Sequence, residues 1–306
     1  LELAGEPLEA LARSRRAGLR LDLSQGARIQ SLPERPRPPI LGGSEESLLM
    51  SKAVSRRYAI ISDLHSNVEA LTNVFADIKS QGVEDIICLG DVVGYGPQPR
   101  EVMAMTMKTV RVSLMGNHDE AVLKGAKNFN AWAREAIDWT REEIQVQDGA
   151  EKERWAYLKR MPMSFQTNGL YFVHGSPRQP TIEYILREDI YNGNYDKFDE
   201  IFESFDKILF VGHSHTPCVI NEDLDYVTPS EIEHNFTYTR DRKKLIVNVG
   251  SVGQPRDNDT RSCYVVVDDD KITFRRVEYD VAPVVKKIKA IDRLSDNLGL
   301  RLKKGV

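Results

Sequence analysis

The sequence has few cysteines: three in 306 residues, at positions 88, 218 and 263, with no Cys-x-x-Cys pair. Their number and wide spacing exclude a disulfide framework and a structural zinc site built from thiolates. They indicate a protein whose thiols are kept reduced, and we expect a cytoplasmic location. Cys88 lies in an apolar segment and is expected to pack in the core.

Long apolar runs and an excess of charge of one sign are also missing. No segment approaches the roughly 20 apolar residues that span a bilayer, so we expect no transmembrane helix. No charged segment followed by an apolar one opens the chain, and we expect no secretion signal. The net charge is −4 and the pI is about 6.0. This balance argues against a large nucleic-acid or membrane-surface footprint, although it leaves room for a local basic patch.

The first 49 residues lack aromatic residues, Val, Thr, Asn, Cys, His and Lys, yet contain seven Arg and five of the 14 Pro. Such a composition cannot build a core. One interpretation of residues 1–49 is a regulatory or targeting arm. We favour a disordered or non-native extension, such as an upstream reading frame translated in error, because Met50 opens a segment that leads into the first predicted strand. We therefore expect a chain that starts at Met50 to fold and act as the full chain does.

From residue 56 onward, short apolar runs alternate with amphipathic segments, which predicts an α/β fold. Residues 67–82 have apolar side chains at helical spacing, with Asn67 as the N-cap and Gly82 as the stop. Asn168-Gly169 lies between two apolar runs and predicts a hairpin. After about residue 216 the pattern is mostly β, and a closing helix is predicted over 282–294. Four aromatic residues of the intervening helices are expected in the core: Phe129, Trp132, Trp139 and Trp155.

Polar residues gather where the predicted strands end. Five of the six His follow apolar runs and have Asp, Asn or Gly beside them, whereas His234 lies in polar sequence and is interpreted as a surface residue. In α/β sheets, ligands bind beyond the carboxyl ends of the strands, so five strand ends could bring these groups together. The candidate metal ligands are Asp63, His65, Asp91, Asn117, His174, His213 and His215.

These seven groups are two carboxylates, one amide and four imidazoles, without a thiolate. This mixture suits Mn²⁺, with Fe, Zn²⁺, Ni²⁺ or Co²⁺ as alternatives. Seven groups are too many for one catalytic ion that keeps an open position, and they fit two ions that share a carboxylate. Each residue alone could be a helix cap or a turn residue. The repetition of the arrangement at five strand ends favours a metal site.

The motifs that carry these residues resemble, in the same order, those of the calcineurin-like metallophosphoesterases, in particular a prokaryotic phosphodiesterase-type branch. They are Asp63-Leu-His65, Gly90-Asp91, Gly116-Asn117-His118-Asp119, His174 and Gly212-His213-Ser-His215. The resemblance implies an α/β fold: a four-layer α/β/β/α sandwich of two mixed sheets with a dimetal site at the strand ends. It covers most of a domain that we place at residues 50–280. Residues 281–306 are expected to form a C-terminal helix packed on this domain or trailing it.

The resemblance also implies roles for individual residues. Asp91 would bridge two metal ions, one also bound by Asp63, His65 and His215, the other by Asn117, His174 and His213. Two ions about 3.5–4 Å apart clamp a phosphate ester and convert a bridging water to hydroxide near neutral pH. His118 would stabilise the transition state or protonate the leaving oxygen. Asp119 would either orient His118 or cap the next helix.

The sequence departs from the Ser/Thr protein phosphatases after the second strand. Gly94 and Tyr95 stand where those enzymes have the Asp that pairs with the catalytic His and an Arg that grips a phosphomonoester. This departure favours phosphodiester substrates, which carry one charge. The candidate substrate-binding residues are Asn67, Tyr95 and Arg256. A phosphomonoester or phosphoprotein phosphatase is the alternative, and a non-catalytic interaction module is a third that the complete motif disfavours.

Overall fold

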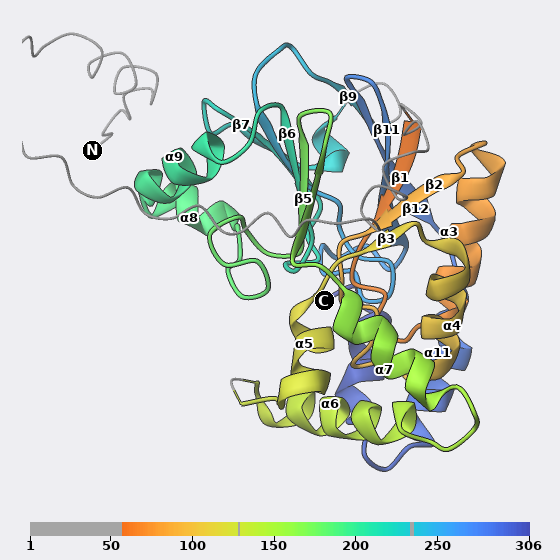
Figure 1. Ribbon diagram of the computed structural model, residues 1–306. Helices are drawn as coiled ribbons and strands as arrows, with labels where there is room; N and C mark the ends of the chain where they lie inside the picture. The colour runs from red at the N-terminus through yellow and green to blue at the C-terminus, as the bar shows by residue number, and fades with distance from the viewer. Residues whose placement is uncertain (1–56, 128, 233–235) are drawn as a thin grey trace, which may run out of the picture. The chain divides into compact units, whose positions relative to one another are not determined.

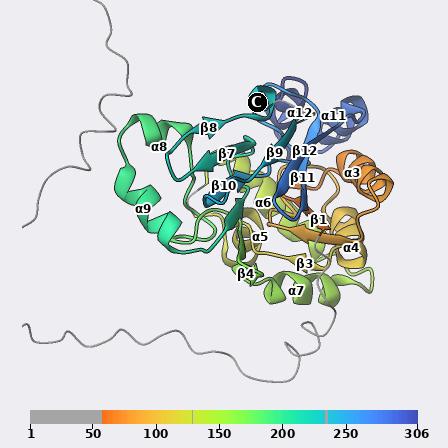
Figure 2. The same cartoon turned by 90° about the horizontal axis from the view of Figure 1, so that it is seen from above.

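The structure is a computed structural model that describes residues 57–127, 129–232 and 236–306 (Figure 1). The predictions for residues 1–49, for Met50 and for His234 fall outside these residues. Within the described part, the strands form two six-stranded sheets. The helices cover the outer faces of both sheets, as Figure 2 shows from above.

The first sheet has the strand order β3-β2-β1-β11-β12-β9. Its parallel half is β3 (Val112–Ser113), β2 (Asp85–Cys88) and β1 (Arg57–Ile61). Its antiparallel half is β11 (Ser262–Asp268), β12 (Lys271–Val277) and β9 (Thr237–Thr239). Strand β1 joins the halves by pairing antiparallel with β11, so this sheet is mixed.

The second sheet is also mixed and has the order β4-β5-β6-β10-β7-β8. Its parallel centre is β5 (Leu170–Val173), β6 (Ile208–Val211) and β10 (Leu245–Asn248). The antiparallel flanks are β4 (Ser164–Thr167), β7 (Cys218–Asn221) and β8 (Tyr226–Val227). The predicted hairpin joins β4 to β5, where Asn168 and Gly169 have φ values of 51° and 80°.

Alternation of apolar side chains along the strands produces the layers. In β1, Tyr58 and Ile60 pack between the two sheets, whereas Ala59 and Ile61 pack under helices of the first sheet. In β6, Phe210 faces the other sheet and Leu209 faces the outer helices. Because both sheets are apolar on both faces, they stack on each other and carry helices outside. The predicted four-layer sandwich is confirmed.

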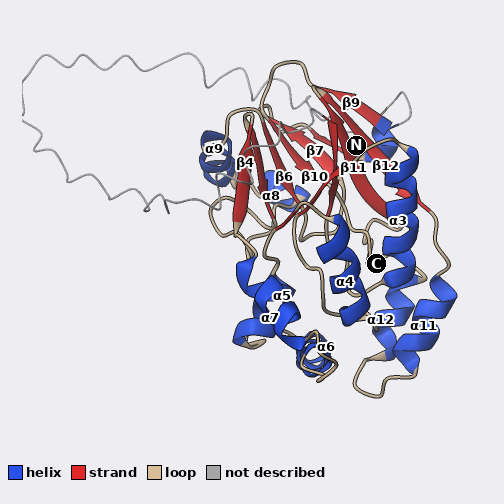
Figure 3. Ribbon diagram, turned by 45° about the vertical axis from the view of Figure 1, so that its right-hand side comes forward, coloured by secondary structure: helices blue, strands red, loops and turns tan. Residues whose placement is uncertain are grey.

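Two groups of helices form the outer layers (Figure 3). The first sheet is covered by α3 (Val68–Ser80), α4 (Pro99–Thr109), α6 (Ala131–Ile144) and α7 (Glu151–Arg160), and the second by α8 (Arg187–Tyr191) and α9 (Tyr195–Glu203). The predicted cap of α3 is confirmed, since the Ala70 N–H donates to the Asn67 side chain at 3.1 Å. Cys88 is fully buried in β2, as expected.

Two predictions about helices need correction. The closing helix predicted over 282–294 ends earlier: α11 covers Val281–Lys289, and a second helix, α12 (Asp296–Leu302), follows with Ser295 as its N-cap. Both pack on Trp139 of α6. Trp132 is not in the core but is 52% exposed, because it lies on the outer side of α6. Across the described residues, no helix is both long and apolar enough to cross a membrane.

Candidate metal centre

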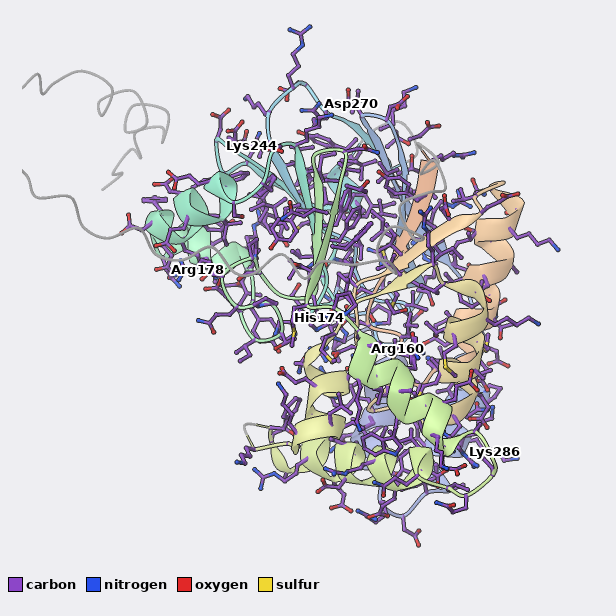
Figure 4. All side chains as sticks on the ribbon, viewed as in Figure 1. Arg160, His174, Arg178, Lys244, Asp270 and Lys286 are labelled. Carbon is purple, nitrogen blue, oxygen red and sulfur yellow. The ribbon has the colours of Figure 1, made fainter. Side chains whose placement is uncertain are left out.

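The seven predicted ligands come from loops that follow five strands and meet at one edge of the two sheets. Asp63 and His65 follow β1, Asp91 follows β2, and Asn117 begins α5 (Asn117–Lys124) after β3. The other three follow strands of the second sheet: His174 follows β5, and the two remaining His follow β6. Figure 4 shows His174 below the end of β5. Asn117 is half-buried, and the other six side chains are at most 5% exposed.

The backbone is strained where it presents these side chains. Asp63, His65 and Asp91 have φ values of 54°, 45° and 52°, and His213 and His215 have 65° and 61°. This left-handed region costs free energy for residues with a Cβ atom, and such strain concentrates at functional sites. Neighbouring loops hold it in place, for example where the Asp63 N–H donates to the Gly90 carbonyl at 3.0 Å. The strained backbone thus lowers local stability but orients these side chains toward one point.

Asp63, His65, Asp91 and His215 form the tighter part of the cluster, with ligand atoms within 4.8 Å of one another. His65 Nδ1 and His215 Nδ1 lie 3.3 and 2.6 Å from the carbonyl oxygens of Val93 and Gln254. A carbonyl only accepts, so both Nδ1 atoms carry the proton and both Nε2 atoms present lone pairs.

These lone pairs face each other and the carboxylates. The two Nε2 atoms are 3.2 Å apart, and His215 Nε2 is 3.2 Å from Asp63 Oδ1. Asp63 Oδ1 is buried and has no hydrogen-bond donor among the described residues. Several acceptor atoms therefore converge without a proton between them, which is unfavourable unless a cation lies there. The residues present fit a divalent metal ion.

The protonation states support this fit. Burial, and then the neighbouring His215, lower the pKa of His65 well below its ordinary value, and burial lowers the pKa of His174 to about 4. These imidazoles are neutral and can coordinate a metal. Burial and the Asp63 carboxylate raise the pKa of Asp91 well above its ordinary value. Two carboxylates at this depth need positive charge beside them to be ionised together.

Asn117, His174 and His213 lie on the other side of Asp91. His174 Nε2 is 3.0 Å from Asn117 Oδ1 and 3.5 Å from Asp91 Oδ2. The His213 ring lies 4.8 Å from the His174 ring, and His213 Nε2 is 3.1 Å from the Ile182 carbonyl oxygen. His213 Nε2 therefore carries the proton, and Nδ1 is the nitrogen with a free lone pair. Asp91 Oδ2 lies between the two groups, 3.7 Å from His65 Nε2 on the first side.

His118 is held beside the cluster. Its backbone N–H donates to Asp91 Oδ1 at 2.8 Å, and its Nδ1 is buried with no partner among the described residues. A Cβ atom at Gly94 would lie 2.5 Å from that Nδ1, so His118 packs directly on the glycine. Burial, and then Arg256, lower the pKa of His118 well below its ordinary value.

The Asp119 carboxylate binds backbone N–H groups. It accepts hydrogen bonds from the N–H groups of Val92, Val93 and Gly116 at 3.1–3.3 Å. These contacts tie the loop after β2 to the start of α5. Of the two roles predicted for Asp119, the structure shows the contacts of a helix cap.

A pocket of about 480 Å³ opens over the cluster, and Tyr95, His118 and Arg256 line it. The Arg256 guanidinium lies 5.9 Å from the centre of the Tyr95 ring and donates to Gln254 Oε1 at 2.8 Å. Asn67 does not line this pocket. Its Nδ2 donates to the Gly253 carbonyl at 2.9 Å, and its Oδ1 caps α3. The structure thus gives Asn67 supporting contacts in place of the predicted substrate contact.

Residues 57–271 match the family model of the calcineurin-like phosphoesterase superfamily domain. The chain belongs to this superfamily. An uncharacterized protein of Methanocaldococcus jannaschii is 36% identical over 258 residues, which cover 81% of this chain and 98% of that protein.

Solved structures agree with this membership. A metallophosphoesterase from Sphaerobacter thermophilus is 37% identical, with a TM-score of 0.67 and coverage of 82% of this chain and 99% of that one. A hypothetical protein from Pyrococcus horikoshii is 21% identical, with a TM-score of 0.62 and coverage of 82% and 98%, and it shares the fold.

Sequence reasoning missed part of the pocket of this superfamily member. Phe129, which was expected in the core, packs partly buried against the core of the first sheet, but it also lines the pocket, where its ring lies 5.0 Å from the His118 ring. Tyr184 was not singled out, yet its ring stacks on His213 at 3.7 Å. The one available signal was position: Phe129 follows the helix of the Asn117–His118 motif, and Tyr184 follows His174 by ten residues.

Proposed function

We propose that this protein hydrolyses phosphodiesters with the help of two divalent metal ions, of which Mn²⁺ is the favoured one. The proposal rests on one observation: the cluster of unprotonated ligand atoms lies under a pocket that also contains His118 and Arg256. Metal ions bound there would polarise the phosphate ester and would supply an activated water.

The residues of the chain then have distinct tasks. Asp91 lies between the two ligand groups and would hold both ions. Gly94 closes off Nδ1 of His118, so Nε2 is the nitrogen left to face the pocket. From there His118 would donate a hydrogen bond or a proton to the oxygen that departs. The His118 N–H that binds Asp91 Oδ1 keeps this side chain and the shared carboxylate in a fixed relation.

The charge of the pocket supports a diester. Lys124, Lys127 and Arg256 line the pocket; Arg256 is the cation that lies against Tyr95, and part of its guanidinium is already used by Gln254. Tyr95 adds a neutral hydroxyl, and no carboxylate contacts the buried Nδ1 of His118 among the described residues. A diester carries one negative charge, whereas a monoester carries close to two near neutral pH and is best held by a bidentate guanidinium.

One observation favours the alternative, a phosphomonoesterase. Arg256 Nε is buried and has no hydrogen-bond partner among the described residues, so it can donate to a second phosphate oxygen. The test measures kcat/KM for bis(p-nitrophenyl) phosphate and for p-nitrophenyl phosphate, with metal content determined on the same sample. We expect Mn²⁺-dependent hydrolysis with the diester preferred. A strong preference for the monoester would establish the alternative, and loss of it in Arg256→Gln would identify the gripping residue.

A further inference from the structure

The pocket extends beyond the metal cluster to the junction of α5 and α6, which lie together in Figure 1. Phe129, Lys127 and Asn130 line this wall, and the proposed hydrolysis uses none of them. The Phe129 ring stands at 75° to the His118 ring, with their centres 5.0 Å apart. A group that departs next to His118 therefore departs alongside Phe129.

The wall combines three kinds of contact. Phe129 provides an aromatic ring. Asn130 Oδ1 is used as the cap of α6, where it accepts from the Ala133 N–H at 2.9 Å, so its amide N–H groups remain to donate. Lys127 is exposed and forms no ion pair among the described residues, in contrast to Lys124, which is 2.6 Å from Glu120. A ligand that uses all three has a flat ring, in-plane acceptors and a nearby negative charge.

A nucleoside joined to phosphate has this chemistry. An apolar aryl group would stack on Phe129 but would not accept hydrogen bonds from Asn130 or Lys127. A sugar would accept those hydrogen bonds but would not stack on Phe129. Stacking on an aromatic side chain is a common way of holding a base without strict sequence preference. The net charge of −4 fits a small nucleotide better than a long nucleic acid, whose backbone needs an extended basic surface.

We propose that the wall of Phe129, Lys127 and Asn130 binds a nucleoside as the leaving group, so that the substrate is a nucleotide diester. The inference rests on the proposed function, because it takes the His118 side as the side of departure. In the reaction, a water oxygen bonds to phosphorus and the bond from phosphorus to the nucleoside oxygen breaks. The attacking water gives up one proton and the departing oxygen takes up one, so the products are a nucleoside and a phosphomonoester.

The test uses one substrate with two bonds to choose from, the methyl ester of thymidine 5′-monophosphate. Hydrolysis releases either thymidine and methyl phosphate, or methanol and the nucleotide. Both leaving groups are primary alcohols of similar acidity, so the product ratio reports which substituent lies at the leaving-group wall. We expect the wild type to release thymidine in preference to methanol by a factor of about 10 or more, which corresponds to a single base-stacking contact.

Variants then assign the preference to the wall. Phe129→Ala should bring the product ratio close to one, and Phe129→Tyr should keep it. Trp132→Ala is the matched control. Trp132 is an aromatic residue close to Phe129 in the sequence, but its side chain is 52% exposed and does not line the pocket. Preferred release of methanol by the wild type, or an unchanged ratio in Phe129→Ala, would overturn the proposal.

A binding measurement separates this inference from the proposed function. If the Mn²⁺-loaded full chain hydrolyses neither this ester nor bis(p-nitrophenyl) phosphate, the proposed function fails. Calorimetric titration with thymidine still tests the wall in that case. We expect binding that weakens about 10-fold in Phe129→Ala and is unchanged in Trp132→Ala. Absence of thymidine binding to the wild type would refute the nucleoside site.

Discussion

The floor of the pocket is the group of seven metal-ligand candidates. Its wall, taken as a whole, adds Tyr95 and His118 to Phe129, Lys127 and Asn130. Six of the seven floor residues are buried, and backbone hydrogen bonds fix them: the His65 N–H donates to the Asp91 carbonyl and the His213 N–H donates to Asp63 Oδ2. Wall residues come from helix ends and loops, and several are partly exposed. The floor therefore suits chemistry that needs fixed geometry, and the wall suits discrimination between substrates.

If this division is right, changes in the floor remove metal and activity together, whereas changes in the wall alter rates or preferences with the metal still bound. Asp91→Asn should have the largest effect, because Asp91 is the residue that both ligand groups share. We expect activity to be nearly abolished, a loss beyond the roughly 10²–10⁴-fold of a single general acid, with less bound metal. Metal analysis and kcat on one preparation measure this, and full metal content with full activity would remove the bridging role.

The floor itself has two unequal sides, which gives the second prediction. Around His65 and His215 the lone pairs meet without any donor, whereas His174 already lies at hydrogen-bond distance from Asn117. His215→Asn should therefore weaken metal binding on the side of His65 and His215. The affinity should fall by at least the 10–100-fold seen when an outer partner of a ligand is lost. His213→Asn should spare the ion on that side and lower the stoichiometry from two toward one. Chelator competition measures both, and equal losses in the two variants would contradict the asymmetry.

His118 is a wall residue next to a metal-ligand candidate, so its replacement tests whether floor and wall have separate functions. We expect His118→Gln to keep both metal ions and to lower kcat by roughly 10²–10⁴-fold, the usual range for a general acid. Substrates with good leaving groups should lose less, because they need less protonation. Equal losses across leaving groups would favour electrostatic stabilisation, and loss of metal would place His118 in the floor.

Gly94→Ala offers an independent check on His118. The added Cβ atom would fall 2.5 Å from His118 Nδ1, at a residue whose φ of 92° already disfavours a side chain. We expect a smaller loss of kcat than in His118→Gln, again with metal retained. Metal content and kcat are measured as before, and an unchanged kcat would show that the contact with Gly94 does not position His118.

The same division explains how much the sequence could predict. Each floor residue belongs to a short motif after an apolar strand, so local pattern was enough to find it, and the cap at Asn67 and the turn at Asn168-Gly169 are local in the same way. Phe129 and Trp132 look alike in sequence. Only the packing of α5 and α6 places one on the pocket and the other in solvent, and periodicity carries no information on that packing.

The loop after β5 shows the same limit. Tyr184 reaches His213 only because residues 176–186 fold back over the end of β6, where the Ile182 carbonyl meets His213 Nε2. The Thr181 hydroxyl also donates to Glu120 of α5 at 2.6 Å, which links two segments about 60 residues apart. Contacts between distant segments depend on the assembled fold, so the wall could not be read from one sequence.

Tyr95→Arg is a change in the wall alone, and its expected effect is the smallest. The Tyr95 ring lies 4.3 Å from the His118 ring and 5.9 Å from the Arg256 guanidinium, so a charge placed here would sit beside the reacting phosphate. Arg offers a charge-assisted fork where Tyr offers one neutral hydrogen bond, and the gain should be larger for a dianion. We expect the ratio of kcat/KM for monoester over diester to rise about 10-fold, with metal content unchanged.

Tyr95→Phe is the control for this change, because it keeps the ring against His118 and adds no charge. The φ of 58° at Tyr95 is strained for Tyr, Phe and Arg alike, so backbone strain cancels between the three chains. The ratio should stay near the wild-type value in Tyr95→Phe. If Tyr95→Arg leaves the ratio unmoved while the wild type already prefers the monoester, then Arg256 supplies the grip and the diester assignment is wrong. If Tyr95→Arg loses metal, the separation between floor and wall fails at this residue.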